Sequence, residues 1–120
     1  MIVDAGEVWW FQLPRVGRKP GVVCSRRAVN LRLMPVIARI TTVERERGLP
    51  TTVPIAQGEV DELPDGGFIL VHDLFLAGPA ARALAPAGRL SARRLVELRE
   101  ALAWTFAIRI RRGSGGGARA

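Results

Sequence analysis

Short apolar segments separated by turn residues run through most of the chain. Residues 14–19 are expected to form the loop between the first two segments, and Pro54, inside the fourth, favours an edge strand or a bulge. Five segments have the length and the β-branched or aromatic composition of strands: residues 6–13, 21–25, 35–42, 51–56 and 68–75. Short strands with compact connections are typical of a small barrel or a strongly curved sheet.

The hydrophobic period changes near the C-terminus. Ser91 is a favourable helix N-cap, and Leu90 before it is placed to pack against the helix. The apolar positions that follow recur at spacings of three, four and four residues: Leu95, Leu98, Leu102 and Phe106. We therefore expect an amphipathic helix packed on the sheet, with Leu90 against Leu95. Shorter helical turns are predicted at residues 26–30 and 79–85.

Length and composition fit one domain. A chain of 120 residues, 48% of them hydrophobic, can bury a modest core. No apolar run approaches the roughly 20 residues that cross a bilayer, and the start lacks the basic-then-apolar order of a signal peptide. The single cysteine, Cys24, is expected to be a small buried side chain. These features predict a protein of the reducing cytoplasm.

The formal charge of +7 is concentrated at the C-terminus. The last twelve residues contain four arginines and no acid, so the rest of the chain has 14 basic and 11 acidic residues. We therefore divide the chain into a domain over residues 1–108 and a flexible, basic, glycine-rich tail over 109–120. Positive charge favours a polyanionic partner.

Two cations precede the second apolar segment, and two hydroxyls end the third. Arg18 and Lys19 stand before Pro20 in "GRKPGVVCS", and Thr41 and Thr42 close "PVIARITT". If the two strand ends meet, they bring a positive charge and a hydroxyl donor to one phosphodiester. Such a fixed pair would stabilise charge that develops on a phosphorus centre.

Aromatic and titratable residues on other strands are further candidates. Trp9 and Trp10 face opposite sides of the first strand, so one is expected in the core and the other at the surface, where it can stack on unpaired bases. In "FILVHDLF", strict alternation turns His72 inward and Asp73 outward. For His72, the only histidine, a structural role and a role at the site both stay open.

The motifs occur in a fixed order between residues 5 and 106. They are "GEVWW", "GRKPGVVCS", Asn30, "PVIARITT", "GLPTTVPI", "DGGFILVHDL" and "AGRLS" before the final helix. In this order and spacing the chain resembles the MazF/PemK family of toxin–antitoxin ribonucleases. The resemblance implies an α+β fold, mainly β. It is an SH3-like small β-barrel of the CcdB/MazF plasmid maintenance toxin type, with a C-terminal amphipathic helix, working as a homodimer.

The same resemblance implies an activity and its partners. It implies a type II toxin that cleaves single-stranded RNA without a metal or other cofactor, through attack of the 2′-hydroxyl. The products carry 2′,3′-cyclic phosphate and 5′-hydroxyl ends. The resemblance also implies restraint by a cognate antitoxin with an acidic C-terminal segment, and no contact with a membrane.

Individual site residues follow from the match to the family motifs. The family's catalytic cation beside the proline falls at Lys19, with Arg18 one step earlier, and the family's threonine matches Thr41. We favour Arg18 as the catalytic charge and Lys19 as a phosphate contact, whereas alignment to Pro20 argues the reverse. The residues expected to contact RNA are Thr42, Trp10, His72 and Asp73.

A second class of function stays open. The related CcdB branch poisons DNA gyrase by contact and cuts no nucleic acid. The "GRKP" and "ITT" motifs favour the ribonuclease, while Lys19 in place of arginine is compatible with a non-cleaving RNA binder. Phe75 and Leu76, which replace a common Arg-Thr pair, point the same way. One histidine and one cysteine give no cluster of metal ligands, so no metal site is predicted.

Overall fold

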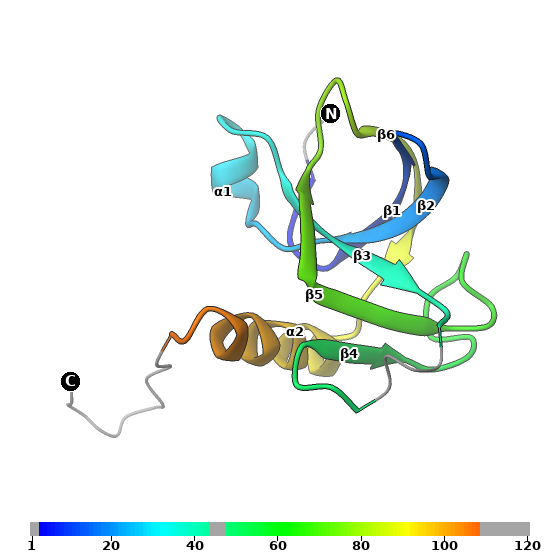
Figure 1. Ribbon diagram of the computed structural model, residues 1–120, viewed down its shortest axis with the longest axis vertical. Helices are drawn as coiled ribbons and strands as arrows, with labels where there is room; N and C mark the ends of the chain where they lie inside the picture. The colour runs from blue at the N-terminus through cyan, green and yellow to red at the C-terminus, as the bar shows by residue number, and fades with distance from the viewer. Residues whose placement is uncertain (1–2, 44–47, 109–120) are drawn as a thin grey trace.

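Six strands and two helices make up the part of the chain that the computed structural model describes, residues 3–43 and 48–108 (Figure 1). The predicted tail over residues 109–120 lies outside the described residues. In chain order the elements are β1 (Glu7–Leu13), β2 (Gly17–Val23), α1 (Arg27–Asn30), β3 (Val36–Thr41), β4 (Thr52–Ile55), β5 (Gly67–Leu76), β6 (Arg82–Arg89) and α2 (Ala92–Thr105). Within these residues no helix is both long and apolar enough to span a membrane.

The strands form one antiparallel sheet in the order β4-β5-β3-β2-β1-β6. The sheet bends strongly, so that β4 and β5 lie beside α2 while β1, β2 and β6 curl away from it (Figure 1). β4 and β6 are open edges, and Pro54 lies in the edge strand β4, as predicted. The architecture confirms the expected small β-barrel-like sheet with a C-terminal helix.

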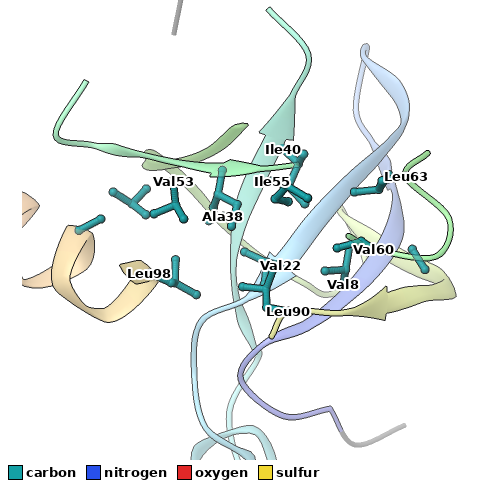
Figure 2. Packing of buried hydrophobic residues seen from close by; sticks show 14 residues of the cluster. Val8, Val22, Ala38, Ile40, Val53, Ile55, Val60, Leu63, Leu90 and Leu98 are labelled. Carbon is teal, nitrogen blue, oxygen red and sulfur yellow. The ribbon is translucent and has the colours of Figure 1, made fainter. Parts of the chain in front are cut away.

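Two buried clusters lie on opposite faces of the central strands. The larger cluster fills the concave side of the sheet and extends to α2 (Figure 2). Its labelled members are Val8, Val22, Ala38, Ile40, Val53, Ile55, Val60, Leu63, Leu90 and Leu98. The smaller cluster includes Phe11 and Ile37. Trp10 packs against the larger cluster and Trp9 against the smaller, so they face opposite sides as predicted, but both are half-buried rather than one in the core and one at the surface. Cys24 is only partly buried, against the larger cluster, so it is more exposed than expected, and desolvation raises its thiol pKa to about 12.

The first hairpin is tighter than the sequence predicts. β2 begins at Gly17 rather than at Gly21, and the loop shortens from the predicted 14–19 to Pro14–Val16. Leu13 and Gly17 close the loop as a cross-strand pair, and Gly17 has φ +92, a conformation in which a side chain would be strained. Polar residues therefore extend β2 because they pair with β1, even though they carry no strand signal.

This extension places both cations inside a strand. Arg18 and Lys19 pair with β1, although the sequence predicts that they belong to a loop. Pro20 is tolerated there because the ladder between β2 and β3 begins only at Gly21, so no donor is needed on that side. The two cations are consequently held by a hydrogen-bonded backbone and point to opposite faces of the sheet.

The helical turn predicted at residues 79–85 is wrong. The segment leads into strand β6, which pairs along β1. Its alanines favour a helix locally, but β1 would otherwise present an unpaired edge next to the core, and tertiary pairing overrides the local preference. Pro86 and Gly88 flank one of the two register shifts in the β1–β6 ladder, and the other lies between Ala83 and Ala85.

The C-terminal helix agrees with its predicted start and differs at its end. The Ser91 hydroxyl accepts a hydrogen bond from the Arg94 backbone N–H at 3.2 Å, and Leu98 is fully buried. Leu95 and Leu102 pack against the cluster that contains Leu90. Phe106, however, is 54% exposed because it lies at the C-cap, where the chain no longer follows the helical stripe.

The helical turn predicted at residues 26–30 is confirmed as α1, and it anchors the start of the chain. The buried Asn30 amide donates to the carbonyls of Val3 at 2.9 Å and Ser25 at 2.8 Å. Asp4 accepts the backbone N–H of Arg27 at 2.8 Å, and such backbone hydrogen bonds lower the Asp4 pKa. The short helix thereby ties β2 to the segment before β1.

Candidate functional site

A pocket of about 360 Å³ opens where β2 and β3 separate. Their ladder has three pairs and ends at Gly21 opposite Arg39, beyond which the two strands diverge (Figure 1). The lining residues that matter chemically are Trp10, Lys19, Arg39, Thr41 and Thr42. The structure therefore brings a candidate cation inside β2, Lys19, together with the hydroxyls at the end of β3.

Thr41 is fixed at the last position of β3. Its side-chain oxygen accepts the Val43 backbone N–H at 3.2 Å, and because a hydroxyl also donates, its proton can be given to a ligand. A Cβ at Gly67, where β5 begins, would lie 2.8 Å from the Thr41 carbonyl oxygen. Glycine is therefore required at that position, and the close strand contact holds Thr41 in place.

The neighbouring cations are divided between two environments. The guanidinium carbon of Arg18 lies 4.2 Å from the centroid of the Trp10 ring, a cation–π contact. Lys19 points to the other face of the strand, is directly opposite Phe11 and lines the pocket with Thr41. Lys19 therefore shares the pocket lining with Thr41, whereas Arg18 covers an aromatic ring of the pocket wall.

Two side chains of this pocket carry unsatisfied donors. The indole nitrogen of Trp10 and Nε of Arg39 are buried, and neither has a hydrogen-bond partner among the described residues. Buried donors without partners cost about 1–3 kcal/mol each, so they are uncommon in folded proteins. Both residues line one pocket, so its walls contain donors that the described protein atoms do not satisfy.

His72 and Asp73 lie differently from the alternation expected on β5. The register between β3 and β5 shifts between Ala38 and Arg39, whose partners are Leu74 and Leu70. This irregularity leaves His72 exposed, so the expected inward orientation is wrong. Asp73 instead accepts a hydrogen bond from Nη1 of Arg39 at 3.3 Å, which connects it to the pocket.

Arg39 is the pocket residue that the sequence interpretation missed. It lies in the middle of the apolar run "PVIARITT", two residues before Thr41. A charge at the centre of a strand otherwise composed of core residues is a signal of a special environment, and that signal was present in the sequence.

A second hollow of about 460 Å³ adjoins the first across Thr42, which lines both. Arg94 of α2 contributes to its wall but is engaged by acids, with Nε 2.9 Å from Glu59 and Nη1 2.8 Å from Glu97. Hydrogen bonds from Arg94 lower the pKa of both carboxyl groups. Within the described ranges, no group of three or more His, Cys, Asp or Glu side chains stands together as a metal-ligand set.

Comparison with known proteins gives a family match and several structural matches. A family model described as a PemK-like, MazF-like toxin of type II toxin–antitoxin systems matches residues 4–106. No curated protein matches the chain significantly.

Three solved structures illustrate the shared fold. A mycobacterial endoribonuclease in complex with its cognate antitoxin aligns with a TM-score of 0.76 at 22% identity, over 91% of this chain and 99% of that one. The Mycobacterium tuberculosis toxin MazF-mt6 gives 0.72 at 24% identity, over 87% and 99%. The MazE–MazF complex from Deinococcus radiodurans gives 0.65 at 22% identity, over 91% and 100%.

Proposed function

Because the chain belongs to the PemK-like, MazF-like family of type II toxins, we propose that it is a metal-independent endoribonuclease acting on single-stranded RNA. The observation that carries the proposal is the presence of Lys19 and Thr41 on one pocket where β2 and β3 diverge. Structurally similar proteins include endoribonucleases, which supports the same reaction class.

The proposed reaction uses the substrate's own nucleophile. The 2′-oxygen forms a bond to the adjacent phosphorus, the bond to the 5′-oxygen breaks, and the proton lost by the 2′-hydroxyl is balanced by one gained at the 5′-oxygen. The products have 2′,3′-cyclic phosphate and 5′-hydroxyl ends. Lys19 and the Thr41 hydroxyl would stabilise the extra negative charge of the phosphorane, a contribution of roughly a hundredfold or more for one oriented donor.

We assign the catalytic charge to Lys19 rather than to Arg18. Lys19 shares the pocket with Thr41, whereas the Arg18 guanidinium is stacked over Trp10. A guanidinium plane or an indole ring can each stack on an unpaired base. The Arg18–Trp10 pair is therefore proposed as a platform for a base next to the scissile phosphate.

The proposed regulator is a cognate antitoxin with an acidic, extended segment. One of the similar structures is an endoribonuclease in complex with its cognate antitoxin, and another is the MazE–MazF complex. An acidic segment fits the cationic side chains around the pocket, namely Arg18, Lys19 and Arg39, by charge complementarity. We expect the antitoxin to compete with RNA, so that saturating antitoxin abolishes cleavage.

The proposed working unit is a homodimer. Large apolar side chains are exposed between α1 and β3 and at the end of β5: Leu31, Leu33, Met34 and Leu76. Leu76 pairs with Val36 at the start of β3, so these segments are neighbours. An apolar surface of this kind on a small domain is typical of an interaction site.

The test is incubation of the purified protein with a long RNA in EDTA, followed by mapping of the new ends. We expect specific cleavage with cyclic phosphate and 5′-hydroxyl ends. A Lys19→Ala, Thr41→Val double variant, purified in the same way, controls for contaminating nucleases. Cleavage that disappears with EDTA and returns with magnesium would refute the mechanism. RNA binding without cleavage would favour the non-cleaving alternative.

A further inference from the structure

Arg39 is placed to act on the same phosphate as Lys19 and Thr41. It lies two residues before Thr41 on β3, so both side chains leave the same face of the strand. Its side chain is 30% exposed and lines the pocket. Arg39 therefore reaches the opening between β2 and β3 from the strand that carries the hydroxyl.

The guanidinium of Arg39 is held by one ion pair, but not all of its N–H donors have hydrogen-bond partners among the described residues. Nη1 donates to Asp73 at 3.3 Å, a long contact for an ion pair, and Nε is buried with no partner among the described residues. Arginine offers five N–H donors in a planar fork. A side chain with buried and unused donors gains by turning toward an anion that enters the pocket.

We propose that Arg39 is a second phosphate-binding residue of this site, and that Asp73 is a positioning residue that holds it. The proposal rests on the ribonuclease function proposed above. Lysine contacts phosphate as a point charge, whereas a guanidinium can engage two phosphate oxygens at once. Lys19 and Arg39 would thus divide the task, one supplying charge and the other fixing the orientation of the phosphate.

Arg89 provides a matched control. It is also a strand arginine in a 3.3 Å ion pair, with Glu7, but it lies on the edge strand β6 rather than at the pocket. If the effect of Arg39→Gln came only from the loss of an ion pair on a strand, Arg89→Gln should have the same effect. Loss of a phosphate contact should affect only Arg39.

The experiment compares Arg39→Gln, Arg39→Lys and Arg89→Gln with the wild type. Single-turnover cleavage is measured on a short RNA that contains the mapped cleavage sequence. Binding is measured on the same RNA with 2′-deoxyribose at the scissile position, at several salt concentrations. Melting temperatures are recorded in parallel, and Arg39→Lys serves as the conservative variant should Arg39→Gln fold poorly.

We expect Arg39→Gln to lower the cleavage rate by roughly a hundredfold, as removal of one oriented donor does. Its binding should also depend less on salt, with the slope of log affinity against log salt smaller by about 0.7 for the lost phosphate contact. Arg39→Lys should keep the slope but cleave more slowly, because the fork is lost. Arg89→Gln should match the wild type.

Asp73→Asn separates positioning from binding. Removing a carboxylate beside the phosphate should leave affinity equal or higher, while the rate at saturating RNA falls because Arg39 is no longer held. Weaker binding with an unchanged saturated rate would overturn the positioning role of Asp73.

The outcomes distinguish this inference from the function on which it rests. A wild type that cleaves RNA, together with an Arg39→Gln variant of normal rate and salt slope, would overturn the inference and leave the ribonuclease intact. A wild type that neither cleaves nor binds RNA would overturn both.

Discussion

The Arg18 guanidinium lies over the Trp10 ring at 4.2 Å, while the next residue along the chain leaves the strand on the other side. Two adjacent cations that look equivalent in the sequence therefore occupy different environments. The alternation of a strand, applied to a β2 that begins at Gly17, is sufficient to separate them. This separation leads to different expectations for the two cations.

Lys19→Ala should reduce single-turnover cleavage by about a hundredfold, equivalent to roughly 2.7 kcal/mol of transition-state stabilisation. Arg18→Ala should instead weaken RNA binding, since it removes the guanidinium plane and the positive charge of the proposed platform, with a smaller effect on the rate at saturation. Rates and affinities measured on the same short RNA separate the two. The reverse pattern would return the catalytic charge to Arg18.

Thr41→Val should cut the cleavage rate strongly and leave the melting temperature close to that of the wild type. Valine keeps the strand-favouring shape and loses only the hydroxyl. Combined with Lys19→Ala, the loss should be smaller than the product of the single losses, as for residues that act on one transition state. Fully multiplicative losses would show that the cation and the hydroxyl act independently.

Arg94→Ala should destabilise the protein at neutral pH by about 1–3 kcal/mol, because it leaves Glu59 without its charged partner and Glu97 with only the exposed Arg93. The Arg94 side chain is only 13% exposed, so the solvent replaces these bonds poorly.

The pH dependence follows from the lowered pKa of both carboxyl groups. Their stabilising contribution is complete above the ordinary glutamate value of 4.5 and is lost as pH falls through the lower folded-state pKa. The difference between wild type and Arg94→Ala should therefore shrink below about pH 4.5.

Arg93→Ala is the control for Arg94→Ala. Arg93 pairs with the same Glu97 at 3.4 Å but is 77% exposed, and exposed pairs contribute about 0–1 kcal/mol. Urea denaturation of the three proteins at pH 7 and pH 3.5 would test the expectation. Equal destabilisation by the two substitutions would contradict it.

Leu33→Asp should weaken the proposed homodimer without unfolding the domain. Leu33 is 67% exposed and lies in the apolar segment between α1 and β3, so a charge there costs little in the monomer. Light scattering at micromolar concentration should report a dimer for the wild type and a lower mass for the variant. Val16→Asp, on an exposed hairpin loop, provides the matched control. A monomeric wild type would refute the dimer.

Most of the strands and the C-terminal helix could be predicted because their local patterns agree with the fold. β6 could not, since Arg82–Arg89 contains alanines, Pro86 and Gly88, and becomes a strand only through pairing with β1. The early start of β2 could not be predicted for the same reason: its first residues are polar and are strand only because they pair with β1.

The candidate site could be predicted in part. The motifs placed Lys19 and Thr41 at strand ends, and the structure brings them to one pocket. The alternation rule could not predict the orientation of His72. The register shift opposite Ala38 and Arg39 changes that orientation, and a single sequence gives no sign of such a shift. Arg39 itself was visible as a charge within the apolar run "PVIARITT", but no role was assigned to it.

The open sheet ends on both sides in a strand that contains a proline, Pro54 in β4 and Pro86 in β6. A proline has no backbone N–H, so a strand from another molecule could not pair continuously along either edge. The Ala87 carbonyl on β6 in addition accepts the Glu62 backbone N–H. The two edge strands therefore offer no continuous template for end-to-end growth into fibres. The prolines thus reduce the tendency to aggregate that edge strands give to an open, barrel-like sheet.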